Sequence, residues 1–183
     1  MYIECLQRHL AVCAMRDLPQ IAKRDPKFWN VVSLLGPEAP TPARLGFRDQ
    51  HRAFLNDVRA TAAGTEMDLR IVDENTMRGI LEFVDERQGQ PILVHCVAGI
   101  SRSPAAALVF ILRGLVAAGA ESPAEMGIDT LLQIRPQARP NPLVLRAGLL
   151  CFLPQTEADG LLSEVMADPR MTRDKRREGF DEE

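Results

Sequence analysis

The most informative stretch of the chain is residues 91–103, which read PILVHCVAGISRS. Its first part, residues 91–95, is a short apolar run that follows a glycine-containing segment, which is typical of a buried strand. A longer, mostly apolar segment follows over residues 103–118, and its length favours a buried helix. We therefore predict that Cys96 ends a strand, that a tight loop follows, and that Arg102 opens a helix.

The loop between this strand and this helix has the properties of an anion-binding site. Backbone N–H groups in such a loop can point inward, and the positive end of the following helix adds to their field. Gly99 permits the sharp turn and the close backbone approach that a side chain would obstruct. Arg102 can hold two oxygens of a phosphate with its planar guanidinium group. The predicted phosphate-binding residues are Val97, Ala98, Gly99, Ile100, Ser101 and Arg102.

The same positive field acts on Cys96. A thiol at a helix N-terminus beside an arginine has a lowered pKa, so we expect Cys96 to be a thiolate near neutral pH. A thiolate that faces a bound phosphate monoester is placed for in-line attack, which gives a thiophosphoryl-enzyme intermediate. Ser103 can donate its hydroxyl to the thiolate and help it leave in the second step. We expect His95 to brace the loop by hydrogen bonds rather than to titrate in catalysis.

Residues 95–103 match the pattern HCxxGxxRS, which resembles the signature of the cysteine-dependent protein tyrosine phosphatase superfamily. The stretches VVSLLGPEAP, FLNDV, ILEFV and PILVHCVAGISRSPAAALVF are similar to small bacterial phosphatases related to the dual-specificity enzymes. The resemblance covers roughly residues 29–153 and is most specific at the loop. It implies a central sheet flanked by helices, phosphate ester hydrolysis in two steps, and no metal or other cofactor.

The resemblance also implies that an upstream aspartate protonates the leaving oxygen and later activates water. Asp57 is favoured because it follows a short strand, precedes a polar loop, and is followed by Val58 as in the bacterial members. Its spacing to the cysteine is longer than in most dual-specificity phosphatases. Asp73 is the next candidate, although it also fits the N-cap of a helix, and Asp68 and Asp49 stay open.

The rest of the chain alternates strand-like and helix-like segments, which predicts an α/β fold with a mostly parallel central sheet flanked by helices. Strands are expected over residues 31–35 and, more weakly, 52–55. A helix is expected over residues 73–87, where Met77, Ile80, Leu81 and Val84 form one apolar face. Two more helices are expected over residues 103–118 and 141–153, and a capping box at 122–125 predicts the start of a further helix.

Length and charge limit the remaining possibilities. A chain of 183 residues fits one domain, which we place at residues 1–167, with a charged and flexible C-terminal tail at 168–183. The net charge of −3 gives no reason to expect a nucleic acid or an anionic membrane as partner. The longest apolar run, residues 104–112, is too short to cross a bilayer. The N-terminus has no basic region of the kind that a secretion signal needs.

Four cysteines are spread along the chain without a CxxC motif, and Cys5, Cys13 and Cys151 have no assigned role. This pattern favours reduced thiols in a cytoplasmic protein over a disulfide scaffold or a zinc site. A second segment of interest contains Arg135–Pro136 and Arg139–Asn141, which lie where related phosphatases place a second loop near the site. A proline-rich connector between helices explains that segment equally well.

The loop interior carries no lysine, whereas superfamily members that take polyphosphorylated inositides tend to place lysines there. We therefore expect a singly phosphorylated substrate, above all phosphotyrosine in a protein, with phosphoserine and phosphothreonine still open. Two alternatives belong to other classes. One is a non-catalytic phosphate-binding module, and the other is an arsenate-reductase or rhodanese-like cysteine enzyme.

Overall fold

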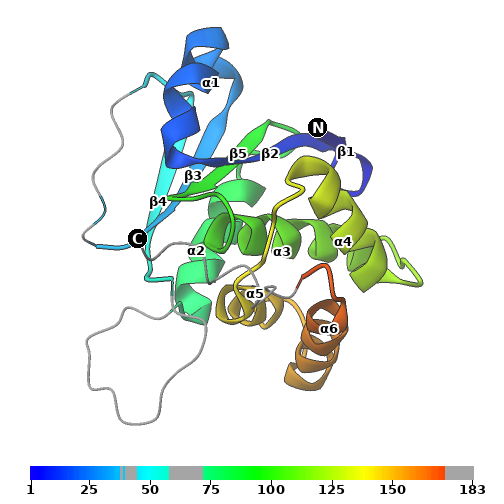
Figure 1. Cartoon of the computed structure of the whole chain (residues 1–183). Coiled ribbons are helices and arrows are strands. Elements are labelled where there is room, and N and C mark those ends of the chain that lie inside the picture. Colours follow the sequence, from blue (N-terminus) through cyan, green and yellow to red (C-terminus); the bar gives the residue numbers. More distant parts are fainter. Residues whose placement is uncertain (38, 40–44, 58–71, 172–183) are drawn as a thin grey trace.

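The computed structural model describes residues 1–37, 39, 45–57 and 72–171 (Figure 1). Its five strands form one sheet in the order β1-β2-β5-β3-β4. The strands are β1 (Tyr2–Ile3), β2 (Arg8–Ala14), β3 (Asn30–Leu35), β4 (Asp49–Phe54) and β5 (Ile92–Cys96). The last four run parallel, and β1 is antiparallel at the edge, so the predicted mostly parallel sheet is confirmed.

Helices cover both faces of this sheet (Figure 1). Helix α1 (Leu18–Arg24) lies on one face. On the other face are α2 (Glu74–Asp85), α3 (Arg102–Ala117), α4 (Pro123–Ile134), α5 (Pro142–Leu149) and α6 (Gln155–Ala167). No helix in the described ranges has the length and apolar content needed to span a bilayer.

Strand β5 lies between β2 and β3 and is buried along its whole length. Successive side chains of a strand point to opposite faces, so Val94 and Cys96 belong to the core beneath the helical layer, whereas Leu93 packs toward α1. The neighbouring strands continue this division, because Val32 of β3 shares the first core and Val31 the second. The strand therefore delivers the Cys96 side chain to the side of the sheet on which α3 lies.

Helix α3 is buried on nearly its whole circumference, which explains its continuous apolar sequence. It packs against β5 on one side and against α4 and α5 on the other. Side chains such as Leu108 and Ile111 have no exposed surface. Burying each of them stabilises the fold by about 1.5–3 kcal/mol. The element that carries Arg102 is thus one of the most firmly held parts of the molecule.

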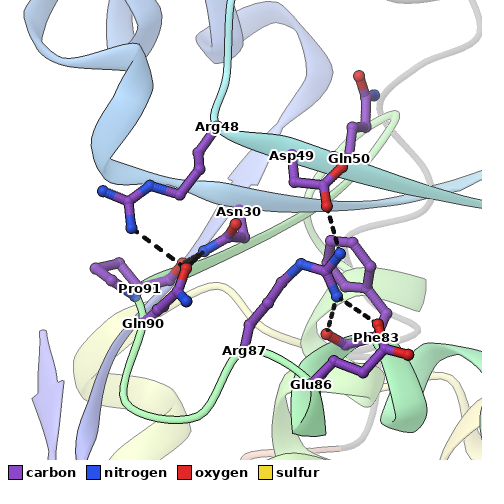
Figure 2. Close-up of polar contacts among 9 residues, drawn as sticks. All are labelled: Asn30, Arg48, Asp49, Gln50, Phe83, Glu86, Arg87, Gln90 and Pro91. Atoms are coloured by element: carbon purple, nitrogen blue, oxygen red, sulfur yellow. Dashed lines mark hydrogen bonds and ion pairs between the residues drawn. The ribbon is translucent and has the colours of Figure 1, made fainter.

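A polar network joins the end of α2 to the starts of β3 and β4 (Figure 2). Arg87 pairs with Asp49 and Glu86, and its guanidinium lies 3.7 Å from the centroid of the Phe83 ring. In the same network the Gln90 side-chain oxygen accepts hydrogen bonds from Asn30 (3.2 Å) and Arg48 (3.2 Å). These contacts hold the turn that leads into β5. That turn lies at the N-terminal end of the strand, and Cys96 lies at the other end.

Several sequence expectations need correction. The strand expected at residues 52–55 begins earlier, at Asp49, and the helix expected over 141–153 ends at Leu149. Ser122 precedes α4, but its side chain makes no capping hydrogen bond, so the predicted capping box is wrong. The predicted start of the flexible tail at residue 168 is too early, because Met171 is fully buried and Arg170 pairs with Asp129 and Asp168. Residues 172–183 of that tail lie outside the described residues.

Candidate active site

The candidate site is the loop that leaves the C-terminal end of β5. Cys96 is the last residue of the strand and Arg102 the first of α3, as the sequence predicts. Gly99 has a positive φ of 69°, and a Cβ atom there would lie 2.6 Å from the carbonyl carbon of Cys13. The loop backbone therefore lies directly against the end of β2, at a distance that only glycine allows.

The backbone carbonyls of all five loop residues are hydrogen-bonded to groups outside the loop. The Val97 carbonyl accepts from Met15 N (3.1 Å). The Ala98 and Gly99 carbonyls accept from the Arg135 guanidinium (3.3 and 2.9 Å). The two remaining carbonyls, of Ile100 and Ser101, accept from Arg139 N (2.8 Å) and Asn141 N (3.1 Å).

These outward carbonyls fix the direction of the loop N–H groups. In a trans peptide unit the C=O and the next N–H point in opposite directions, so carbonyls held from outside turn the amides toward the loop interior. The Gly99 amide already donates to the Cys96 Sγ atom (3.2 Å). The result is a ring of convergent donors, which is the arrangement that binds a phosphate group.

The Cys96 sulfur lies beside these amides, and its hydrogen bonds favour the anionic form. Burial by itself raises the pKa of the Cys96 thiol. Hydrogen bonds from the Ser103 hydroxyl (3.2 Å) and from the Ser103 and Gly99 amides, together with the charge of Arg102, outweigh burial and hold that pKa below its ordinary value. The side chain is 1% exposed. Surroundings of this kind favour the thiolate form of a cysteine.

One nitrogen of the Arg102 guanidinium is hydrogen-bonded to the protein, and another is not. Its Nη1 donates to the Leu55 carbonyl (2.9 Å), which sets the orientation of the plane. Its Nε is buried and has no hydrogen-bond partner in the described part of the chain. Because a buried donor without a partner is unfavourable, this N–H is available to a ligand. An oxygen of an anionic ligand would be such an acceptor.

Asp57 is brought to the same loop. Its Oδ1 accepts hydrogen bonds from the Ser101 hydroxyl (2.6 Å) and the Asn141 amide (2.9 Å), and its Oδ2 is 3.8 Å from Arg102 Nε. The other aspartates are placed differently. Asp73 caps α2 by accepting from Thr76 N (2.7 Å), and Asp49 begins β4, at the end of that strand opposite to Asp57. Asp68 lies outside the described residues.

His95 has no exposed surface and lies on the face of the sheet opposite to Cys96. Its Nε2 is 2.7 Å from the Ser33 hydroxyl on the paired strand, and Gln50 in turn donates to that hydroxyl (2.9 Å). Burial lowers the pKa of His95 to about 4, so the ring is neutral at physiological pH. These contacts suit a bracing role for the residue.

The sequence only partly identified the residues that shape the loop. The segment with Arg135 and Asn141 does reach the site, where it holds carbonyls and the Asp57 carboxylate. The contributions of Met15 and Leu55 were missed, because they are made by backbone atoms and no side chain in the sequence signals them. Only the path of the folded chain brings these groups to the loop.

Within the described residues, the other three cysteines form no hydrogen bond or disulfide with Cys96, although Cys13 lies on the strand next to it. Cys13 belongs to the core on the α1 face of the sheet, Cys5 contacts the Ile111 carbonyl in the second half of α3, and Cys151 contacts α5. All four thiols are free, and burial raises the pKa of each of these three. Over residues 1–37, 39, 45–57 and 72–171, no three His, Cys, Asp or Glu side chains gather as metal ligands would.

No protein-family model matches the sequence, and a comparison with curated proteins gives no match either. Among solved structures, the chain is similar to the Cydia pomonella PTP-2 phosphatase, with 17% identity, a TM-score of 0.54, and coverage of 80% of this chain and 88% of that one. It is also similar to the human tyrosine phosphatase-like serine/threonine/tyrosine-interacting protein (18% identity, TM-score 0.52, 81% and 87% coverage). A third similar structure is PTPMT1 in complex with PI(5)P (17% identity, TM-score 0.50, 85% and 93% coverage). The chain therefore has the fold of the protein tyrosine phosphatases, as the sequence motif predicts.

Proposed function

We propose that this protein is a phosphatase of the protein tyrosine phosphatase type that hydrolyses phosphate monoesters through a thiophosphoryl-cysteine intermediate. The observation that carries the proposal is a cysteine with a lowered pKa that accepts a hydrogen bond from the Gly99 amide of the loop. Beside it lies an arginine whose buried Nε makes no hydrogen bond in the described part of the chain. A site that only stored phosphate would need the amides and the arginine, but it would not need a stabilised thiolate.

In the first step the Cys96 sulfur attacks phosphorus in line with the leaving oxygen. The S–P bond forms, the P–O bond to the leaving group breaks, and the leaving oxygen takes a proton from Asp57. The loop amides and Arg102 hold the equatorial oxygens, where negative charge accumulates. The Ser101 and Asn141 donors both engage Oδ1 of Asp57, so Oδ2 is the oxygen available for proton transfer.

In the second step water attacks phosphorus and gives a proton to the Asp57 carboxylate, while the S–P bond breaks. The sulfur leaves as a thiolate, and the Ser103 hydroxyl stabilises it through the hydrogen bond already in place. Inorganic phosphate and the starting protonation states of both residues result. Each turnover therefore restores the enzyme without any other reactant.

The rim of the loop favours a singly phosphorylated, uncharged leaving group. Val97 (45% exposed) and Ile100 (38% exposed) present apolar surface beside the phosphate-binding amides. Such a rim suits the aromatic ring of phosphotyrosine better than a polyanionic inositide headgroup, which needs added positive charge. A phosphotyrosine-containing protein is the proposed substrate, and a reducing, cytoplasmic setting would keep the nucleophile active.

Two other activities are less well supported. A non-catalytic module of this fold has no use for the Ser103 bond to Cys96. An arsenate reductase needs a second thiol that reaches the first, and Cys13, the nearest along the sheet, belongs to the core on the other face.

The test is hydrolysis of para-nitrophenyl phosphate by the purified full chain in a buffer without added metal ion. We expect turnover that vanadate inhibits, a phosphorylated cysteine in acid-quenched protein, and loss of both in Cys96→Ser. Cys151→Ser is the matched control and should keep full activity, because Cys151 lies away from the loop. Turnover that survives Cys96→Ser would rule out the proposed nucleophile. A panel of phosphopeptides and phosphoinositides then tests the substrate, and preference for an inositide would contradict the phosphotyrosine assignment.

A further inference from the structure

A second cavity lies at the far end of α3 from the phosphate-binding loop. It has a volume of about 250 Å³ and is formed by the last turns of α2, the second half of α3 and the single-turn helix η1 (Glu4–Leu6). The α3 residues that line it fall between Phe110 and Ala117. At 1.5 Å per residue, they are roughly 12–22 Å along the helix axis from Arg102. The cavity is therefore separate from the candidate active site.

A buried arginine forms part of the lining of this cavity. Arg8, the first residue of β2, lines the cavity and is only 7% exposed. Its Nη1 donates to the Val84 carbonyl (3.0 Å), and no carboxylate in the described ranges pairs with it. Burial lowers the pKa of Arg8. Because a charge removed from water is costly unless it is paired, the guanidinium favours an anion from outside the chain.

The other charged groups at the cavity do not fully neutralise Arg8. The charge of Asp85 raises the pKa of Arg8, but the same carboxylate is paired with Arg113. Two guanidinium groups and one carboxylate line the cavity, so it keeps a net positive charge. The remaining surface is mostly apolar, with Leu6, Leu81 and Phe110 among the lining side chains. A positive charge beside an apolar surface suits a molecule with one anionic group and a hydrocarbon chain.

We propose that this cavity binds a small organic acid, with the carboxylate on the Arg8 guanidinium and the hydrocarbon part against Leu6, Leu81 and Phe110. A guanidinium binds a planar carboxylate through two parallel hydrogen bonds, which fits the donors that the Val84 carbonyl leaves unused. A free phosphate ion would gain nothing from the apolar wall. The volume lies below the roughly 300–1,000 Å³ of sites for drug-sized ligands, so the acid is compact.

The experiment compares hexanoate with hexanamide on the purified full chain, by backbone NMR titration. Hexanoate should shift the amide resonances of Gly114 and Ala117, which line the cavity, and it should bind at least about tenfold more tightly than hexanamide. The two ligands share their hydrocarbon part, so the difference isolates the carboxylate. Equal affinity, or shifts at the loop residues 97–101 in place of the cavity, would overturn the proposal.

Two matched variants test the role of the arginine. Arg8→Met should lose the preference for hexanoate, whereas Arg16→Met removes the same charge from a side chain that is 88% exposed and should retain it. A folded Arg8→Met protein with unchanged hexanoate affinity would refute the assignment of Arg8. If Arg8→Met does not fold, the comparison of the two ligands on the unaltered chain decides the proposal. None of these measurements depends on phosphatase activity.

Discussion

The hydroxyl of Ser101 donates a 2.6 Å hydrogen bond to Oδ1 of Asp57, so the phosphate-binding loop and the candidate general acid are directly connected. Asn141 adds a second bond to the same oxygen, and its own backbone N–H holds the Ser101 carbonyl. The carboxylate, the loop and the start of α5 are therefore joined by hydrogen bonds. Support of this kind places an acid within reach of a leaving oxygen without cost in each turnover.

The first prediction concerns Asp57. Asp57→Asn keeps the shape of the side chain but removes the transferable proton. Hydrolysis of aryl phosphates with poor leaving groups should slow by about 10²–10⁴-fold, while activated esters should slow much less. The measurement is the dependence of kcat/KM on leaving-group pKa. Asp73→Asn is the control, because it alters only the cap of α2 and should leave that dependence unchanged. Equal losses on all esters would remove Asp57 from this role.

The second prediction concerns Arg135, which holds the Ala98 and Gly99 carbonyls from outside the loop. Arg135→Gln should loosen the orientation of the amides that follow them. Hydrogen bonds to a charged group contribute about 1.5–3 kcal/mol each, so kcat/KM and the affinity for vanadate should both fall by about 10–100-fold. Arg16→Gln, at an exposed position, should change neither. Reduced activity with unchanged vanadate affinity would show that Arg135 does not position the loop.

The third prediction compares two glycines with nearly the same backbone. Gly99 and Gly119 have φ values of 69° and 70°, but a Cβ at Gly119 would meet no atom within 4 Å, whereas one at Gly99 would collide with Cys13. Alanine at Gly119 should cost about 1 kcal/mol of unfolding free energy, from backbone strain alone. Alanine at Gly99 should cost several kcal/mol and should also reduce phosphate binding. Chemical denaturation measures both values, and equal costs would contradict the close packing of the loop on β2.

The parts of the molecule that the sequence predicts well are those in which the signal is local. Strand β5, the loop and α3 follow one another within residues 92–117, and the apolar runs and the motif are continuous there. Strand β2 was not predicted, because Arg8 and His9 interrupt its apolar pattern. The burial of Arg8 depends on the Val84 carbonyl, a partner far away in the sequence. Nothing within β2 itself indicates that this arginine faces inward.

The candidate site divides in the same way. Cys96, Arg102 and Ser103 stand at fixed offsets in one motif, so their proximity is predictable from the sequence. The groups that hold the loop and Arg102 come from Met15, directly after β2, from Leu55, directly after β4, and from the segment before α5. Most of these contacts use backbone atoms, which every residue has. Their positions are set by the packing of the sheet and helices, and a single sequence does not display it.

The last prediction concerns pH. The Ser103 hydroxyl is the largest of the influences that lower the pKa of Cys96, against the opposing effect of burial. Removing it in Ser103→Ala should raise that pKa, so the thiolate should form at higher pH than in the unaltered protein. The ultraviolet absorbance of the thiolate, taken as the difference from Cys96→Ser, follows this titration directly. The rising limb of kcat/KM against pH should move in the same direction, because only the thiolate attacks phosphorus.

The same substitution should act on the second chemical step. Without the hydroxyl the departing thiolate loses one hydrogen bond to a charged group, so breakdown of the thiophosphoryl intermediate should slow by about 10–100-fold. The intermediate should then accumulate, and a burst of para-nitrophenol should precede the steady state. Ser122→Ala is the matched control, since the Ser122 hydroxyl forms no capping bond at α4. A thiolate titration that stays in place in Ser103→Ala would mean that the loop amides and Arg102 stabilise the anion without help from this hydroxyl.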